Sequence, residues 1–265
     1  MRSKNCDTIF IDYGDLGSKN ILSRYIKSDK EFIYMKYLEW DTKFFGKDSY
    51  NLDVKKSNFK VSKNMIESLK NNFLNSFITV KLDTNYDYAY SDFLQKCDFR
   101  YIDTEVELVY KNQIDIDLND EINIVKLNKN INLPYKELGS SFSLTRFHTD
   151  LNISNKKADK LWIEYLKNFK PNNEKILYIA KIKNEIVGVV LVNIAENIVN
   201  IFYIAVLEKF RSFGVGKVMI QEIIKKYKNF IIKTETQVKN INALNFYIKN
   251  GFMIENTKSV FHRWG

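Results

Sequence analysis

The sequence predicts a mixed α/β (α+β) fold, because strand patterns and helix patterns alternate along the chain. Three β-branched runs, Ile176–Ile182, Ile186–Ile194 and Ile198–Val206, are joined by short polar turns. Such runs are typical of an antiparallel meander. Apolar residues spaced along one helical face follow between Val218 and Tyr227.

The C-terminal segment predicts another strand, another helix and a final hairpin. Phe230–Val238 alternates between two side-chain sets, one of which contains Glu235. A helix is expected from about residue 242 to residue 250, ending at Gly251, a residue that tolerates the left-handed conformation. Phe252–Ile254 and Val260–Trp264 are predicted to pair as the hairpin.

Two domains are expected. Residues 1–115 contain a helical stripe from Met65 to Leu74 and a strand pattern over Thr104–Tyr110, which indicates a smaller N-terminal α/β domain. The polar, acidic stretch KNQIDIDLNDEIN then marks the boundary, and residues 116–265 form the second domain. We find no internal sequence repeat at a fixed period.

The composition indicates a globular protein, since 45% of residues are hydrophobic and only two are proline. The start of the chain has no secretory apolar core, and Ile186–Val206 is interrupted by polar residues, so we expect a cytoplasmic protein without membrane insertion. Cys6 and Cys97 lack metal-ligand spacing and are expected to be free thiols, and no metal is predicted.

The net charge of +9 favours anionic ligands, but the lysines are spread along the chain without a basic block. No nucleic-acid-binding motif accompanies them, so no nucleic acid is expected as a partner. A homodimer is left open by the sequence.

A candidate phosphate site lies where the strand ending at Val206 leads into the next helix. Arg211-Ser212-Phe213-Gly214-Val215-Gly216 precedes the helical pattern. Unpaired N–H groups and the helix dipole at such a position can hold a pyrophosphate, because glycines let the backbone approach closely. Tight strand–helix packing is the alternative explanation of the glycines.

These residues and those that follow resemble the GCN5-related N-acetyltransferase (GNAT) superfamily. Residues 211–216 match its (Q/R)-x-x-G-x-(G/A) motif, which binds the pyrophosphate of acetyl-CoA. The resemblance covers about residues 121–265, and it implies a mixed, largely antiparallel central sheet splayed at the fourth and fifth strands. The second motif, N-x-x-A-x-x-x-Y-x-x-x-G-F, is matched by Asn240, Ala243, Tyr247, Gly251 and Phe252.

The resemblance also implies the residues that bind acetyl-CoA, which serves as co-substrate. The backbone of Ile204, Ala205 and Val206 would pair with the pantetheine arm as an added strand does. Asn240, in the motif shared with Ala243, would contact the pantetheine. The residues expected around the pyrophosphate are Arg211, Ser212, Phe213, Gly214, Val215, Gly216 and Lys217.

Tyr247 is the expected general acid, because it would protonate the departing thiolate as the thioester bond breaks. It follows Asn240 by about two helical turns, so both side chains lie on one helical face. Its alternative role is that of a core aromatic packed beside Phe246.

The proton acceptor for the amine is less defined by the sequence. Glu235 is a candidate base, acting directly or through water, because its strand passes near the presumed thioester. A solvated carboxylate without a role and a water chain are the alternatives. His148 and His262 are the only histidines, and both have structural explanations.

A second resemblance concerns the acceptor. The segment Glu39-Trp40-Asp41-Thr42-Lys43-Phe44-Phe45-Gly46 is similar to the E-W-D-x-x-F-F-G signature of dTDP-fucosamine acetyltransferases, which acetylate a dTDP-4-amino-4,6-dideoxygalactose. The segments 103–104, 143–150 and 260–264 are similar to the same family. That family commonly has Ser-Arg-Phe where this chain has Thr145-Arg146-Phe147.

This resemblance implies a nucleotide-sugar acceptor of the dTDP-4-amino-4,6-dideoxyhexose type, with substrate contacts from Arg146, Phe147, Asp41 and Phe44. Arg146 would grip phosphate oxygens in bidentate fashion, although a surface ion pair explains it equally well. Phe44 has the alternative of a core position, and Asp41 that of a helix cap. The N-terminal domain is accordingly a candidate for acceptor contacts.

The predicted function is therefore direct acetyl transfer from acetyl-CoA to the amino group of a nucleotide-linked amino sugar. One alternative is a GNAT enzyme that acts on another small amine or a polypeptide N-terminus. Another is a non-catalytic acyl-CoA-binding module that regulates a partner.

Overall fold

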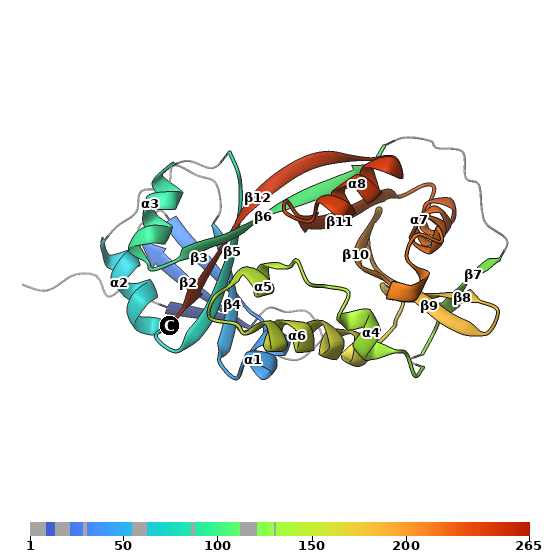
Figure 1. Cartoon of the computed structure of the whole chain (residues 1–265). Helices are drawn as coiled ribbons and strands as arrows, with labels where there is room; N and C mark the ends of the chain where they lie inside the picture. The colour runs from blue at the N-terminus through green and yellow to red at the C-terminus, as the bar shows by residue number, and fades with distance from the viewer. Residues whose placement is uncertain are drawn as a thin grey trace, which may run out of the picture. The chain divides into compact units, whose positions relative to one another are not determined.

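The computed structural model describes residues 9–13, 22–28, 31–54, 63–85, 88–111, 121–129 and 131–265. Two compact units are present, and Figure 1 shows their helices and strands. Unit 1 comprises Met1–Asp103 together with Lys258–Gly265, and unit 2 comprises Thr104–Thr257. Both units combine sheet and helices, which confirms the predicted mixed α/β class.

Unit 1 is a mixed sheet with helices in its connections. Neighbouring strands are antiparallel except β4 and β5, which are parallel. The helices are α1 (Glu39–Phe45), α2 (Lys63–Asn72) and α3 (Tyr88–Lys96). The strand order is β1 (Ile9–Tyr13), β2 (Leu22–Ser28), β3 (Glu31–Tyr37), β4 (Asp48–Val54), β5 (Ser76–Asp83) and the last part of β12 (Phe252–Trp264).

The core of unit 1 encloses Cys97, whose side chain is fully buried and forms no disulfide among the described residues. Burial raises the pKa of the Cys97 thiol from 9.0 to about 12, because the thiolate loses its hydration there. Cys6, the other predicted thiol, lies outside the described residues.

We predict that Cys97 is nearly inert towards Ellman's reagent in the native protein at pH 8. The thiolate is the reactive species, so the raised pKa lowers its fraction on the order of 10³-fold relative to an ordinary thiol. The measurement uses a Cys6→Ala variant, in which Cys97 is the one remaining cysteine. Rapid labelling without denaturant would contradict the prediction, whereas labelling in urea should be fast.

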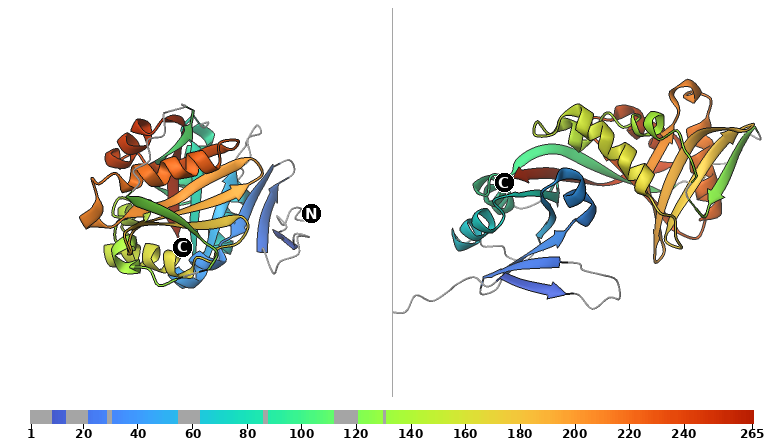
Figure 2. Two further views of the ribbon diagram at one scale, coloured as in Figure 1. Left: turned by 90° about the vertical axis from the view of Figure 1, so that its right-hand side faces the viewer. Right: turned by 90° about the horizontal axis from the view of Figure 1, so that it is seen from below.

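Unit 2 contains the predicted antiparallel meander. Strands β8 (Lys175–Ile182), β9 (Glu185–Ala195) and β10 (Ile198–Val206) pair antiparallel in sequence order, which confirms the prediction. They are yellow to orange in both views of Figure 2. The remaining strands of this unit are β7 (Ile122–Leu127) beside β8, β11 (Ile231–Gln237) beside β10, and then β6 (Arg100–Tyr110) and the first part of β12.

Helices cover both faces of the unit 2 sheet, and each face has its own apolar cluster. One cluster packs α7 (Val215–Lys226) and α8 (Ile241–Lys249) against the strands. The other packs α4 (Tyr135–Gly139) and α6 (Asn155–Asn168) against the opposite face. Because both faces are covered, the middle of β9 is buried at every residue from Val187 to Val192.

The described strands of the two units follow one topological order. In unit 1 the antiparallel run β1–β4 is followed by parallel β5 and antiparallel β12. In unit 2 the antiparallel run β7–β10 is followed by parallel β11 and antiparallel β6. The last strand of each order comes from the other half of the chain: residues 258–264 pair within unit 1, and residues 105–109 pair within unit 2.

The predicted C-terminal hairpin is wrong. Residues Phe252–Trp264 form one continuous strand, β12, without a turn in its middle. The polar stretch predicted as a turn, residues 255–259, contains neither glycine nor proline, so it can remain extended. Asn256 lies in this stretch and donates a hydrogen bond to the Glu107 carboxylate on β6 (3.1 Å).

Candidate active site

The candidate site of unit 2 begins where β10 and β11 separate. These parallel strands pair from Ile198 opposite Ile231 to Ile201 opposite Thr234. Beyond that pair, β10 continues to Val206 alongside β9 alone, while β11 continues to Gln237 alongside β6. The sheet therefore opens at its fourth and fifth strands, as predicted, and leaves a length of β10 edge beyond Ile201 without a β11 partner among the described residues.

A β-bulge marks the start of this opening. The pairing of β10 with β9 shifts register between Ile201 and Tyr203. Phe202 and Tyr203 consequently both pack into the cluster under α4 and α6, whereas Ile201 and Ile204 pack on the α7 side. A bulge re-aims the backbone, and bulges are over-represented beside active sites.

The loop before α7 has the geometry of an anion-binding turn. Ser212 and Gly214 both have positive φ, +69° and +79°, and Gly214 is the N-cap of α7. No side chain caps this helix, whereas Ser154 caps α6 and Asn240 caps α8. The first N–H groups of α7 consequently lack side-chain partners and remain available to an anion.

Two cations flank this loop. Arg211 and Lys217 are both exposed, and neither forms an ion pair with a carboxylate in the part of the chain that the structure describes. Phe213 is 64% exposed, and Ser212 and Gly214 are exposed as well. Exposed cations around an uncapped helix start fit the diphosphate of a nucleotide-like molecule.

Tyr247 on α8 reaches the point where the strands separate. Its phenol lies beside Thr234, whose hydroxyl donates a hydrogen bond to the carbonyl of Ile201 (2.8 Å), the partner of Thr234 in the last β10–β11 pair. The side chain is only 4% exposed and packs against Phe246 and Phe252. Burial raises the pKa of Tyr247 to about 12, because the phenolate would lose its hydration there, so the phenol holds its proton at neutral pH.

Glu235 is exposed on the opposite face of β11 from Thr234. Ile232, Thr234 and Thr236 are buried, as the predicted alternation requires, and the residues between them point to the other side. Glu235 therefore lies on the sheet face opposite to that of Tyr247, which packs on the α7 side.

Asn240 begins α8 and serves as its cap. Its Oδ1 accepts a hydrogen bond from the N–H of Ala243 at 3.2 Å. The spacing of these two residues in the motif is thus explained by helix capping. A contact of Asn240 to pantetheine stays a prediction, and its side-chain NH₂ group is the part that capping leaves available.

Arg146 and Phe147 open α5 (Arg146–Thr149), a single helical turn. Phe147 is 5% exposed and contacts Trp162, which makes it a core residue in this structure. Arg146 is half-buried, with its guanidinium 4.7 Å from the Phe147 ring centroid. Among the described residues Arg146 makes no ion pair, so the predicted alternative of an ion pair receives no support.

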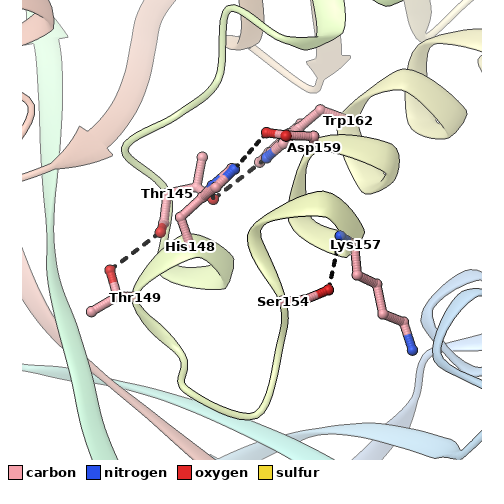
Figure 3. A network of polar contacts seen from close by, with 7 residues as sticks. All are labelled: Thr145, His148, Thr149, Ser154, Lys157, Asp159 and Trp162. Carbon is pink, nitrogen blue, oxygen red and sulfur yellow. Dashed lines mark hydrogen bonds and ion pairs between the residues drawn. The ribbon is translucent and has the colours of Figure 1, made fainter.

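A polar network lies beside Arg146, and the sequence did not predict it as part of the site. His148 Nδ1 lies 2.8 Å from Thr145 Oγ1, and His148 Nε2 lies 3.0 Å from Asp159 Oδ1 (Figure 3). Trp162 Nε1 approaches Thr145 Oγ1 at 3.5 Å. The sequence holds only two histidines, and that scarcity was the one available hint.

Asp41 and Phe44, the other predicted acceptor contacts, belong to α1 of unit 1. Phe44 stacks on Trp40 with ring centroids 5.3 Å apart and meets Phe45 edge-on. The N-cap of α1 is Leu38, so Asp41 lies within the first turn and is not the cap. The other predicted site residues belong to unit 2, and the acceptor contacts of Asp41 and Phe44 stay predictions.

No cluster of three or more His, Cys, Asp or Glu suited to a metal ion occurs within the described ranges. None of the described helices has the length and hydropathy required to cross a membrane.

A family profile of known proteins matches most of unit 2. Residues 142–252 match the profile of the acetyltransferase (GNAT) family. No curated protein matches the chain.

Solved structures resemble most of the chain at low identity. A functionally unknown conserved protein from Staphylococcus epidermidis has a TM-score of 0.61 at 11% identity, covering 93% of this chain and 96% of that one. A GCN5-related N-acetyltransferase from Sphaerobacter thermophilus has a TM-score of 0.59 at 11% identity, covering 91% and 80%. A tandem GNAT protein from the clavulanic acid biosynthesis pathway has a TM-score of 0.56 at 8% identity, covering 92% and 82%. These likenesses establish the fold.

Proposed function

We propose that this chain, an enzyme whose residues 142–252 form a GNAT-family acetyltransferase domain, transfers acetyl from acetyl-CoA to the amino group of a nucleotide-linked amino sugar. The acceptor class is the dTDP-4-amino-4,6-dideoxyhexose type. The observation that carries the proposal is the uncapped start of α7 next to the unpaired edge of β10.

The chain's own groups fit acetyl-CoA at this place. The N–H groups at the start of α7, with Arg211 and Lys217, would hold the diphosphate. The free edge of Ile204–Val206 would pair with the amide-containing pantetheine arm, as a strand added to a sheet does. When bound, acetyl-CoA supplies a thioester whose carbonyl accepts the amine.

The acid and base groups lie on opposite faces of the sheet. Tyr247 would donate its proton to the departing thiolate sulfur from the α7 side. We assign the amine's proton to Glu235, directly or through water, because this exposed carboxylate lies on the sheet face opposite to Tyr247. At the opening between β10 and β11, groups from both faces of the sheet would reach the thioester.

The sugar-nucleotide acceptor is supported by Arg146 and by the resemblance of segments 39–46 and 143–150 to dTDP-fucosamine acetyltransferases. Arg146 is a cation without a carboxylate partner among the described residues, and the neighbouring α5 residues are held by side-chain contacts. An arginine in this state can bind phosphate oxygens through two parallel N–H bonds.

We predict that the purified protein releases CoA from acetyl-CoA when a dTDP-4-amino-4,6-dideoxyhexose is added. The thiol product is measured with a chromogenic disulfide, and mass spectrometry should find the acetylated sugar. Matched reactions contain a dTDP-hexose without an amine, free amino sugars, amino acids and peptides. Turnover with peptides but with no sugar nucleotide would overturn the acceptor assignment. Absence of turnover with every amine tested would favour a binding module.

A further inference from the structure

The single turn α5 has little stability of its own. It contains four residues, and its backbone bonds include Thr149 N–H to Thr145 O (3.2 Å) and Asp150 N–H to Arg146 O (3.1 Å). Isolated helices of this length are unstable in water because nucleation is costly. The position of Arg146 therefore depends on the side chains that hold the turn.

The Thr145 hydroxyl takes an unusual partner for a residue at a helix start. Thr145 is the N-cap of α5, but its side chain makes no capping bond to the backbone. Its hydroxyl lies instead 2.8 Å from His148 Nδ1, and Thr145 is 5% exposed. The Thr145 hydroxyl therefore forms a hydrogen bond with the His148 imidazole and does not cap the helix.

The hydrogen bonds around His148 have one consistent direction. A carboxylate only accepts, so His148 Nε2–H donates to Asp159 (3.0 Å). In the neutral imidazole Nδ1 then accepts from the Thr145 hydroxyl, whose oxygen faces the Trp162 N–H. The chain runs from half-buried Trp162 to Asp159, which also lies on α6 and has a side chain that is 46% exposed (Figure 3).

Side chains of α5 and its network contact β10 and the turn that follows β11. Trp162 stacks on Phe142 (4.8 Å between centroids), and Phe142 packs on Tyr203 of the β10 bulge (4.4 Å). On the other side, Lys239 donates a hydrogen bond to the Thr149 hydroxyl. Lys239 lies in the turn between β11, which ends at Gln237, and α8, whose cap is Asn240. Contacts from α5 and its network consequently reach both β10 and the β11–α8 turn.

We propose that the Trp162–Thr145–His148–Asp159 chain positions α5 so that Arg146 binds the anionic part of the acceptor. The inference rests on the proposed function, since it concerns the acceptor side of the same site. Thr145, His148 and Asp159 are positioning residues in it, because they act through Arg146. The ligand chemistry is a phosphate or diphosphate group attached to the amine-bearing substrate.

The test is a double-mutant cycle with Thr145→Val and Arg146→Ala, and Thr145→Ser is the matched control. Valine keeps the shape of threonine without the hydroxyl, whereas serine keeps the hydroxyl. We expect Thr145→Val to raise the acceptor KM about tenfold, the scale of one charge-assisted hydrogen bond. The kcat and the acetyl-CoA KM should stay within about twofold of the parent, and Thr145→Ser should resemble the parent.

The cycle also tests the route of the effect. If Thr145 acts through Arg146, Thr145→Val should add little to the KM of the Arg146→Ala protein. Equal acceptor KM values for Thr145→Val and Thr145→Ser would overturn the inference, and so would a full additional effect in the Arg146→Ala background. Should Thr145→Val fail to fold, Asp159→Ala tests the same chain from its exposed end.

Inhibition by dTDP separates this inference from the proposed function. If the parent acetylates the sugar nucleotide and Thr145→Val leaves both KM and dTDP inhibition unchanged, the positioning role alone is wrong. If the parent neither acetylates a sugar nucleotide nor is inhibited by dTDP, the acceptor assignment is wrong and the inference falls with it.

Discussion

Replacement of Tyr247 by phenylalanine should lower kcat for acetyl transfer by roughly 10²- to 10⁴-fold, the range typical of a lost general acid. The variant keeps the ring that packs against Phe246 and Phe252 and removes only the hydroxyl. Acetyl-CoA affinity should change little, because the diphosphate contacts lie at the start of α7. Steady-state kinetics and calorimetric titration with acetyl-CoA measure the two quantities separately.

Tyr227→Phe is the matched control for this change. Tyr227 packs in the same apolar cluster as Tyr247, on the sheet face that α7 covers. Its phenol is hydrogen-bonded to that of Tyr178 at 2.8 Å. Both variants lose one phenol hydroxyl from the same apolar cluster, at a cost of about 1 kcal/mol of unfolding free energy. If Tyr247→Phe retained turnover within a few-fold of Tyr227→Phe, Tyr247 would be only a core aromatic.

The pH dependence provides a further check on the same residue. Burial raises the pKa of Tyr247 to about 12, so its proton is present throughout the range from pH 7 to pH 10. The acid form is lost only as pH rises towards 12, and stability contributed by the neutral phenol is lost in the same direction, from pH 10 upward. A fall in kcat centred near pH 8 would therefore come from another group.

Replacement of Gly214 by valine should raise the KM for acetyl-CoA at least about tenfold, which corresponds to about 1.4 kcal/mol. Gly214 has a φ of +79°, a conformation that a β-branched residue adopts only under strain. Relaxation of this φ would turn the first N–H groups of α7 away from the diphosphate. An added Cβ meets no atom within 4 Å, so the effect comes from the backbone and not from a clash.

Gly46→Val supplies the control, because Gly46 has a similar φ of +70° and equally open surroundings at the end of α1. Both variants should lose roughly 1–3 kcal/mol of stability through the same strain. Only Gly214→Val should lose affinity for acetyl-CoA in a titration at a temperature where both are folded. If the two variants bound acetyl-CoA with equal affinity, the proposed role of the Gly214 turn in binding the diphosphate would be wrong.

Local patterns were sufficient for most of unit 2. Alternation over residues 230–238 predicted the two faces of β11, and the β-branched runs predicted the meander. The glycine at 214 predicted the start of α7, and the glycine at 251 has the positive φ expected after α8. These features follow from side-chain period and from backbone freedom at single residues, which neighbouring sequence determines.

The C-terminal strand shows where local patterns failed. Residues 255–259 are polar, and polarity alone was interpreted as a turn. In the structure they stay extended, since Asn256 pairs with Glu107, almost 150 positions earlier in the chain. A pairing of such long range leaves no periodic signal near either partner.

The sequence by itself determined the chemistry that unit 2 offers: a glycine turn at a helix start, a tyrosine two turns beyond a helix cap, and an alternating strand between them. Only the tertiary structure decided that β6 and β12 each complete the strand order of the other half, and that Thr145, His148, Asp159 and Trp162 form one chain. The physical reason is that period and capping act within a few residues, whereas strand exchange and side-chain networks depend on contacts between segments far apart in sequence.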